Sequence, residues 1–279
     1  MLTINCKGKI LSLADPLIMG IINATPDSFY QGHLDEGIPA MVLKAEQMLS
    51  EGADILDVGG QSSRPGSQRI SVDEELERVL PLIGAIHEKI PGAIISIDTY
   101  YSSVALAAVA AGASIVNDIS AGSMDESMLG TVASLHVPYV CMHMKGNPAT
   151  MQLEAVYEDV VKEVLDFFIS KVDSCLKAGI RDVIIDPGFG FGKSIEQNFR
   201  LLRSLELLSI TGKPILAGLS RKSTIYKTLG ITPAEALNGT TTLNTIALLN
   251  GASILRVHDV RAAKEAVLLF NAYKKAPQI

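Results

Sequence analysis

Short apolar runs and longer amphipathic runs alternate eight times along this sequence. The apolar runs are continuous and rich in Ile, Val and Leu, as is typical of parallel strands buried on both faces. They begin near Leu17, Asp54, Ala93, Ser114, Pro138, Asp182, Pro214 and Ser253. The helical patterns cover 37–50, 73–89, 102–111, 125–135, 154–178, 195–208, 233–249 and 260–273. Strict alternation predicts a parallel sheet, and the count of eight favours a closed (β/α)8 barrel, or TIM barrel, over an open doubly wound sheet.

The positions of the glycines, the N-terminal segment and the length of the chain fit a single barrel. Glycines at 52, 112, 179 and 251 each follow a helical run and precede a strand, where glycine supplies the left-handed residue that ends a helix. Residues 1–15 resemble two short strands around Lys7-Gly8, so we expect a β-hairpin outside the barrel that plugs its bottom. The length of 279 residues is close to the roughly 250 typical of this fold. We therefore predict a single domain over 1–279, with the hairpin at 1–15 and the barrel at 16–275.

The composition indicates a soluble α/β protein. Hydrophobic residues make up 48% and charged residues 19%, which supports a large core and argues against disorder. A net charge of -6 gives no electrostatic basis for binding nucleic acid. The cysteines, Cys6, Cys141 and Cys175, are few and far apart, which fits a reducing cytoplasm. No signal-peptide pattern and no apolar run of about 18 residues is present, so we expect a cytoplasmic protein with no membrane partner.

Polar residues follow every apolar run at the point where the strand should end. They are Asn23, Asp57, Asp98, Asn117-Asp118, His143, Asp186, Ser220-Arg221-Lys222 and Arg256-Val257-His258. In a barrel of this type, catalytic groups lie at the C-terminal ends of the strands. One polar residue there usually only begins a solvated loop, but eight such ends on one rim indicate a binding pocket.

The residue types at these ends suggest a substrate with two parts. Asp98, Asn117 and Asp186 suit a heterocycle with an exocyclic amine and ring N–H groups, because carboxylates accept hydrogen bonds from such edges. A second set suits a pyrophosphate, since Arg and Lys supply charge-assisted bonds and hydroxyls and amides add neutral ones. This set is Lys222, Arg256 and His258, with Asn23, Ser63 and Arg64 from the first two loops.

Two local patterns are discounted as sites. DPGFGFGKS looks like a phosphate-binding loop, but that pattern requires glycine at position 187, where this chain has Pro187. His143 lies near Cys141 and could suggest a metal, but the other histidines are scattered. A core or orienting histidine is the better interpretation.

The motifs together carry a resemblance to a known family. MGIINATPDSF, GGQSSRPGS, SIDT, IVNDISAG, CMHMKGNPATMQ, DPGFGFGKS, GLSRKS and RVHDV occur in this order. The set resembles the dihydropteroate synthases, and the likeness covers nearly the whole chain from Leu17 onward. These enzymes are transferases of folate biosynthesis that join 6-hydroxymethyl-7,8-dihydropterin pyrophosphate to 4-aminobenzoate, with release of 7,8-dihydropteroate and pyrophosphate.

The resemblance implies specific roles for residues of this chain. The pterin site would consist of Asp98, Asn117, Met142, Asp186 and Lys222. The pyrophosphate site would consist of Asn23, Ser63, Arg64, Arg256 and His258, with Asn23 also holding Mg2+. The 4-aminobenzoate site would consist of Ser63, Arg64, Pro65, Phe191, Ser220 and Lys222. The catalytic residues would be Asp98, Lys222, Arg256 and His258. The family is typically dimeric, which implies a homodimer, and we place its interface on the 154–178 helix and the last two helices.

Departures from the family pattern leave two alternatives open. Gln61 and Ser63 stand where the usual motif has glutamate and threonine, and Ser63 keeps the hydroxyl. A pterin-binding methyltransferase domain would share the barrel and the carboxylates but would not use Lys222, Arg256 and His258 on a pyrophosphate. A non-catalytic pterin-binding paralogue would result if Gln61 abolished turnover.

We also predict that the loops Asn23–Phe29 and Gln61–Ser67 are mobile in the empty site and order with pyrophosphate and metal.

Overall fold

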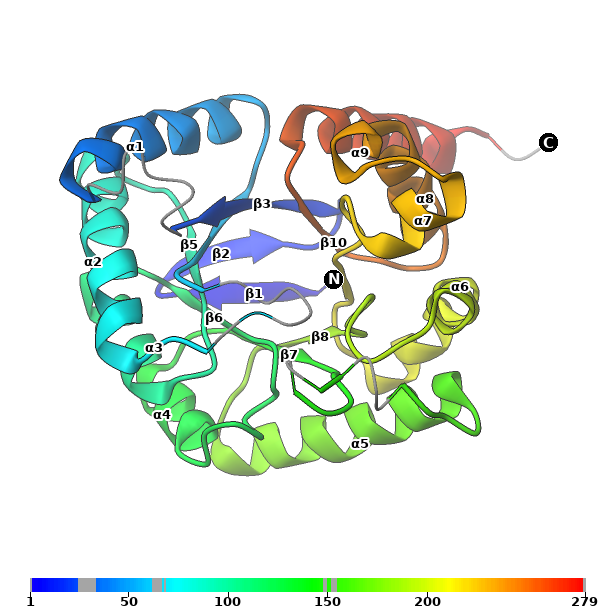
Figure 1. Ribbon diagram of the computed structural model, residues 1–279, viewed down its shortest axis with the longest axis horizontal. Coiled ribbons are helices and arrows are strands. Elements are labelled where there is room, and N and C mark those ends of the chain that lie inside the picture. The colour runs from blue at the N-terminus through cyan, green and yellow to red at the C-terminus, as the bar shows by residue number, and fades with distance from the viewer. Residues whose placement is uncertain are drawn as a thin grey trace.

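Eight parallel strands form the centre of the molecule in the computed structural model, which confirms the predicted barrel. They are β3 (Leu17–Asn23), β4 (Ile55–Gly59), β5 (Ile95–Asp98), β6 (Ile115–Asp118), β7 (Tyr139–Met142), β8 (Val183–Asp186), β9 (Leu216–Ala217) and β10 (Ile254–Val257). Their order around the sheet is β8-β7-β6-β5-β4-β3-β10-β9. A parallel bridge between Ile185 and Ile215 links β8 to β9 and closes the ring. Figure 1 shows the helices as an outer ring around these strands.

The structure describes residues 2–24, 34–61, 67, 69–147, 150–151 and 155–277, without the side chains of 34–36. Ser63, Arg64 and Pro65 lie outside the described residues, so their predicted roles stay predictions. The prediction of mobile loops over Asn23–Phe29 and Gln61–Ser67 concerns mainly residues outside this description.

Nine α-helices lie in the described part of the chain. They are α1 (Leu34–Ser50), α2 (Val72–Lys89), α3 (Ser102–Ala111), α4 (Met128–Leu135), α5 (Val160–Ala178), α6 (Ile195–Arg203), α7 (Ser223–Leu229), α8 (Leu237–Leu249) and α9 (Val260–Lys275). Two 3-10 helices, η3 (Leu205–Thr211) and η4 (Pro233–Glu235), lie among them. None of these helices is long and apolar enough to cross a membrane.

Several helix boundaries differ from the predicted ones for local reasons. Helix α5 begins at Val160 rather than 154, because the Asp159 carboxylate accepts the backbone N–H groups of Val161 and Lys162 as an N-cap. The predicted helix 195–208 ends at Arg203 and continues as η3, where Leu205 and Leu208 are both buried at the three-residue spacing of a 3-10 turn. Helix α7 was not predicted, because seven residues are too few to show a helical period.

The N-terminal hairpin is confirmed. Strands β1 (Thr3–Cys6) and β2 (Lys9–Ser12) pair in antiparallel fashion around Lys7 and Gly8, whose φ angles are 51° and 92°. Ile4 and Cys6 pack against inward-facing residues of the barrel strands and close its bottom, as predicted. The four glycines predicted to end helices, 52, 112, 179 and 251, all have positive φ.

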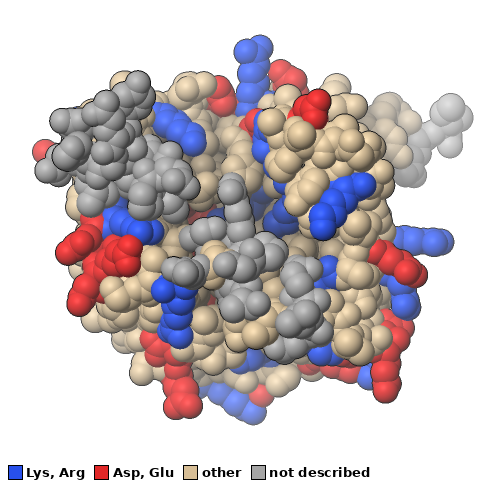
Figure 2. Space-filling view, viewed as in Figure 1, with Lys and Arg blue, Asp and Glu red and all other residues tan. Residues whose placement is uncertain are grey.

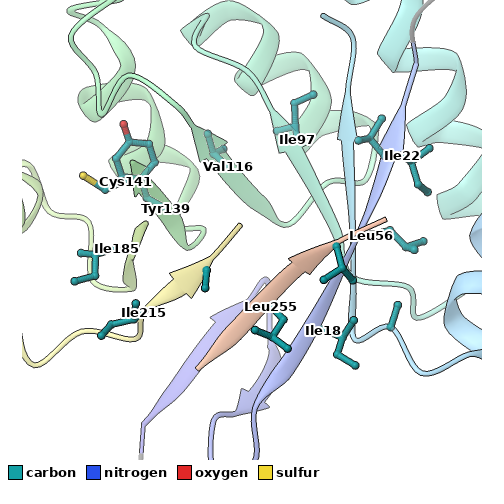
Figure 3. Close-up of a cluster of buried hydrophobic side chains, with 14 of the residues drawn as sticks. Ile18, Ile22, Leu56, Ile97, Val116, Tyr139, Cys141, Ile185, Ile215 and Leu255 are labelled. Atoms are coloured by element: carbon teal, nitrogen blue, oxygen red, sulfur yellow. The ribbon is translucent and has the colours of Figure 1, made fainter. Parts of the chain in front are cut away.

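The barrel strands separate two apolar layers. Side chains that point outward, such as Ile18, Leu56 and Ile185, pack against the surrounding helices and form the larger core (Figure 3). Side chains that point inward near the amino ends of the strands form a second layer with the hairpin. The remaining inward positions, nearer the carboxyl ends, are therefore the ones left to bind a ligand.

Candidate active site

The inward-facing side chains change from apolar to polar along the strands. The lower layer consists of Met19, Ile55, Ile94, Ile115, Val140, Ile184, Leu216 and Ile254. Two residues further along each strand, on the same face, the chain has Ile21, Asp57, Ser96, Asn117, Met142, Asp186, Gly218 and Arg256. The polar members of this second layer, with Asp98 and Lys222, form the pocket floor, the name we keep for this set. Figure 2 shows Lys and Arg side chains recessed near the centre of one face.

Arg256 links two strands on one side of the pocket floor. Its Nε donates to Asp57 Oδ2 at 2.6 Å, and its Nη2 donates to Asp98 Oδ2 at 2.6 Å. Asn117 Nδ2 donates to the same Asp57 oxygen at 3.0 Å. Three residues predicted to bind substrate are thus held together by a fourth, Asp57.

Burial and neighbouring charges set the protonation of Asp98. Burial raises the pKa of this carboxyl to about 7, the Arg256 cation opposes the rise, and the charges of Asp57, Asp118 and Asp186 add to it. Asp98 therefore changes charge near neutral pH.

Asp186 and Lys222 lie together on the other side of the floor. Asp186 Oδ1 accepts the backbone N–H of Gly188 at 2.8 Å. A Cβ on Gly218 would lie 3.6 Å from Lys222 Nζ and 3.9 Å from Asp186 Oδ2, so this glycine leaves room between them. Burial lowers the pKa of Lys222 to about 8, and the Asp186 carboxylate opposes that shift. The pair supplies an acceptor and a donor side by side.

Apolar and aromatic residues line the upper part of the pocket. Met142 and Phe191 are buried and belong to a small cluster with Tyr100, Ile119 and Met151. The Lys222 ammonium lies 4.7 Å from the centroid of the Phe191 ring. This surface offers flat aromatic rings a place to pack beside the lysine.

Ser220 and His258 meet at the edge of the pocket. Ser220 Oγ lies 3.0 Å from His258 Nδ1, and the His258 backbone N–H donates to Ser220 Oγ at 3.2 Å. His258 is an exposed residue whose second ring nitrogen, Nε2, has no hydrogen bond to a described residue, while Ser220 is buried. This contact joins a residue predicted for the aminobenzoate site to one predicted for the pyrophosphate site.

The glycine-rich segment after β8 is not a phosphate loop, in agreement with the sequence analysis. Lys193 is buried and its Nζ contacts His143 Nδ1 at 2.9 Å, Gly188 O at 3.0 Å and Phe191 O at 3.1 Å. Its ammonium thus holds the turn that carries Phe191. The His143 ring packs edge-on against Phe167 with centroids 4.8 Å apart, which makes it an orienting histidine of the core.

Two strand-end residues bind neighbouring segments of the chain rather than face the pocket. The Asp118 carboxylate accepts from Tyr139, Ser120 and Gly122, each at 2.7 Å. Arg221 makes a two-bond ion pair with Asp259, with both distances 2.8 Å. The expectation that every strand end converges on one site is wrong for these two.

Gln61 has a definite place in the structure. Its Nε2 donates to Glu75 Oε2 at 2.8 Å, and its Oε1 accepts from the Tyr100 hydroxyl at 2.6 Å. Glu75 is fully buried, and burial raises the pKa of its carboxyl to about 7. A glutamate at position 61 would face Glu75 with a second carboxylate, so the amide here makes a hydrogen bond that needs no shared proton.

The described residues offer few ligands to a metal ion. Asn23 ends β3 with an exposed side chain, next to Gly59 of β4 in the register. No group of three or more His, Cys, Asp or Glu residues that could hold a metal occurs in the described part of the chain. One neutral oxygen suits Mg2+ that arrives with phosphate and keeps several waters.

Sequence reasoning missed three residues of this region: Asp57, Glu75 and Lys193. Asp57 was noted as a strand end but given no role. Counting two residues on from Ile55 would have placed it inward, in the same layer as Asn117 and Arg256. Glu75 and Lys193 lie outside the strands, and nothing in their spacing marks them.

Comparison with known proteins places this geometry in a family. The family model described as "Pterin binding enzyme" matches residues 19–258. The dihydropteroate synthase of Escherichia coli K12 is 41% identical over 274 residues, which cover 98% of this chain and 96% of that protein.

Solved structures agree. Xanthomonas albilineans dihydropteroate synthase with 4-aminobenzoic acid has a TM-score of 0.92 and 41% identity, with 99% of each chain covered. The same enzyme in complex with 7,8-dihydropteroate has a TM-score of 0.88 and 39% identity over 99% of this chain and 100% of that one. The chain therefore belongs to the pterin binding enzymes and, within them, to the dihydropteroate synthases.

Proposed function

We propose that this protein condenses 6-hydroxymethyl-7,8-dihydropterin pyrophosphate with 4-aminobenzoate, giving 7,8-dihydropteroate and pyrophosphate. The reaction is the transfer that forms a C–N bond in folate biosynthesis. The observation that supports it most is the pocket floor, where Asp98, Asn117 and Asp186 lie with Lys222 and Arg256 above an apolar layer.

The pterin would lie on the floor with its amine and ring N–H groups toward the carboxylates. Asp98 and Asp186 accept hydrogen bonds from these groups, and Asn117 adds a neutral acceptor. Asp186 Oδ2 has no hydrogen bond among the described residues, so it is available to the ligand. Met142 lines the pocket beside the pterin, and Lys222 lies between the pterin and the aminobenzoate.

The reaction breaks the C9–O bond of the pterin pyrophosphate and forms a bond from the amine nitrogen to C9, with loss of one proton from the amine. Arg256 offsets the charge that develops on the departing pyrophosphate, and the neutral ring of His258, whose pKa desolvation and the Arg256 cation lower to about 4, adds a hydrogen bond, with Asn23, Ser63 and Arg64 as further ligands. Asp98 and Asp186 stabilise the positive charge that spreads over the pterin. No covalent enzyme intermediate is needed, so the protein acts by positioning and electrostatics.

The second substrate would pack on the aromatic side of the pocket. Phe191 offers its ring face, and Lys222 lies 4.7 Å from that ring's centroid. Ser220 contributes a hydroxyl next to His258. Ser63, Arg64 and Pro65 complete the aminobenzoate site in the proposal.

We also propose Mg2+ as a cofactor that binds with the pyrophosphate, with Asn23 as its protein ligand. A magnesium ion would neutralise charge on the leaving group. The donor set fits this use, because Mg2+ usually binds through few protein groups together with phosphate oxygens and water.

We further propose a cytoplasmic homodimer whose protomer is one domain over 1–279. The proposed contact is an apolar groove between α8 and α9 that a second copy would cover. Leu269 and Tyr273 on α9 are 73% and 70% exposed there, and Leu249 on α8 lies beside them. Sedimentation of the wild type and of Leu269→Glu tests this: the variant should be monomeric, and an unchanged state would contradict the interface.

The function is tested by measuring pyrophosphate release with each substrate alone and with both. A synthase releases pyrophosphate continuously only with both substrates. A pterin-binding methyltransferase domain and a non-catalytic paralogue would both release no pyrophosphate. That result would overturn the proposal.

A further inference from the structure

Asp57 belongs to the pocket floor and contacts two of its other members. It is the third residue of β4, opposite Ile21 of β3 and Ser96 of β5 in the register, and it is fully buried. A fully buried carboxylate is costly unless cations or donors surround it. Both of its partners, Arg256 and Asn117, belong to the predicted substrate site.

One oxygen of Asp57 serves both partners. Oδ2 accepts from Arg256 Nε at 2.6 Å and from Asn117 Nδ2 at 3.0 Å. An ionised carboxylate only accepts hydrogen bonds, so Asn117 must turn its Nδ2 toward it. The amide oxygen, Oδ1, is then the atom left for a ligand, and it makes no hydrogen bond within the described part of the chain.

The same contact orients Arg256. Two of its three nitrogens, Nε and Nη2, donate to Asp57 and Asp98. The third, Nη1, has no hydrogen bond to any described residue. A planar guanidinium held at two corners presents its third in a fixed direction.

We propose that Asp57 is a positioning residue of this site: it fixes Asn117 as an acceptor for the pterin and holds Arg256 with Nη1, which bonds to no described residue, left for the substrate. The inference rests on the proposed function. A residue that only stabilised the barrel would need no contact with two substrate ligands.

The main test is Asp57→Asn, which keeps the size and removes the charge. The new amide can donate to Asn117 Oδ1, so Asn117 can turn its donor toward the pterin. We expect affinity for a non-reactive pterin to fall about ten- to a hundredfold, as for loss of a hydrogen bond to a charged group. The matched control is Asp54→Asn, at the residue just before β4, where the carboxylate accepts from the backbone of Ile18. Its activity and pterin affinity should match the wild type.

A pH profile separates positioning from simple destabilisation. The charged groups that act on Asp98 are Arg256, Asp57, Asp118 and Asp186, and Glu75 and Lys222 also interact with it electrostatically. Removing the Asp57 charge takes away a like charge, so the acid limb of kcat/KM should move to lower pH. A variant that is merely less stable would lose activity without moving this limb.

A double-mutant cycle adds a second readout. If Asp57 acts through Asn117, Asp57→Asn should cost at least about threefold less in an Asn117→Ala background than in the wild type. Equal costs in both backgrounds, with an unmoved acid limb, would refute the inference.

The wild type supplies a measurement that needs no folded variant. In a crystal structure with a non-reactive pterin bound, Asp57 Oδ2 should stay within hydrogen-bonding distance of Arg256 and Asn117. Separation of both contacts in that complex would overturn the proposal. Failure of the wild type to bind pterin would instead refute the proposed function, whereas normal pterin binding by Asp57→Asn would refute only the role of Asp57.

Discussion

Substituting Asp186 by asparagine tests the pterin site with little disturbance of the fold. Oδ1 of the aspartate accepts from the Gly188 backbone at 2.8 Å, and an asparagine oxygen can keep that bond. The new Nδ2 then occupies the position of Oδ2, so a donor faces the donors of the pterin. A buried hydrogen bond to a charged group contributes about 1.5–3 kcal/mol, so we expect a roughly ten- to hundredfold weaker affinity.

The effect on the neighbouring lysine adds to this loss. The Asp186 carboxylate supports the charged form of Lys222, whose pKa burial lowers to about 8. Without that carboxylate the pKa falls further, so Lys222 should be largely neutral at pH 8 and kcat should fall as well.

The assay is titration calorimetry with a non-reactive pterin, followed by steady-state kinetics. Asp182→Asn is the matched control, because Asp182 lies just before the strand that ends at Asp186 and accepts from the Asn5 backbone of the hairpin at 3.0 Å. It should bind pterin normally. Pterin affinity of Asp186→Asn within about twofold of the wild type would contradict the role of Asp186, because the predicted loss is at least tenfold.

Three further predictions concern protonation, stability and metal. Since Asp98 has a pKa of about 7 and must be ionised to accept from the pterin, kcat/KM should fall as the pH drops below neutral; a flat profile from pH 5 to 8 would contradict this. The pKa of Glu75 rises from 4.5 to about 7 on folding, so the folded state binds its proton more tightly and loses stability as the pH rises through that range. Glu75→Gln should therefore raise the unfolding free energy at pH 8 by at most about 3 kcal/mol and change it little at pH 4. The exposed control Glu77→Gln should change it little at both pH values, and an equal effect of Glu75→Gln at both would refute the account. Mg2+ should bind weakly to the empty enzyme and tightly with pyrophosphate present, and calorimetry showing tight binding to the empty enzyme would contradict the assignment of Asn23.

The fold follows from the sequence because parallel strands buried on both faces leave long apolar runs. The predicted runs at Leu17, Asp54 and Asp182 all became strands, and the hairpin around Gly8 formed as expected. Because these runs are apolar on both faces, the sequence does not show which of their side chains point inward. Asp57 therefore looked like another strand end, although its contacts with Arg256 and Asn117 hold the pocket floor together.

Contacts between distant segments were beyond the reach of the sequence. Lys193 lies in a motif that suggests phosphate binding, yet its ammonium turns to His143, fifty positions away. Gln61 was an unexplained departure until the structure placed it between Glu75 and Tyr100. Such contacts depend on how loops pack over the barrel, which local propensity and periodicity do not encode.

The central claim is that the pocket floor transfers a dihydropterin from its pyrophosphate ester to an aromatic amine, with release of pyrophosphate. Its most direct measurement is the amount of 7,8-dihydropteroate, identified by mass, against the amount of pyrophosphate released by wild type and by Lys222→Met. We predict equal amounts of the two products from the wild type and a severe loss of both in the variant. Pyrophosphate released without matching 7,8-dihydropteroate would contradict the account, because the floor would then hydrolyse the pterin substrate instead of transferring it.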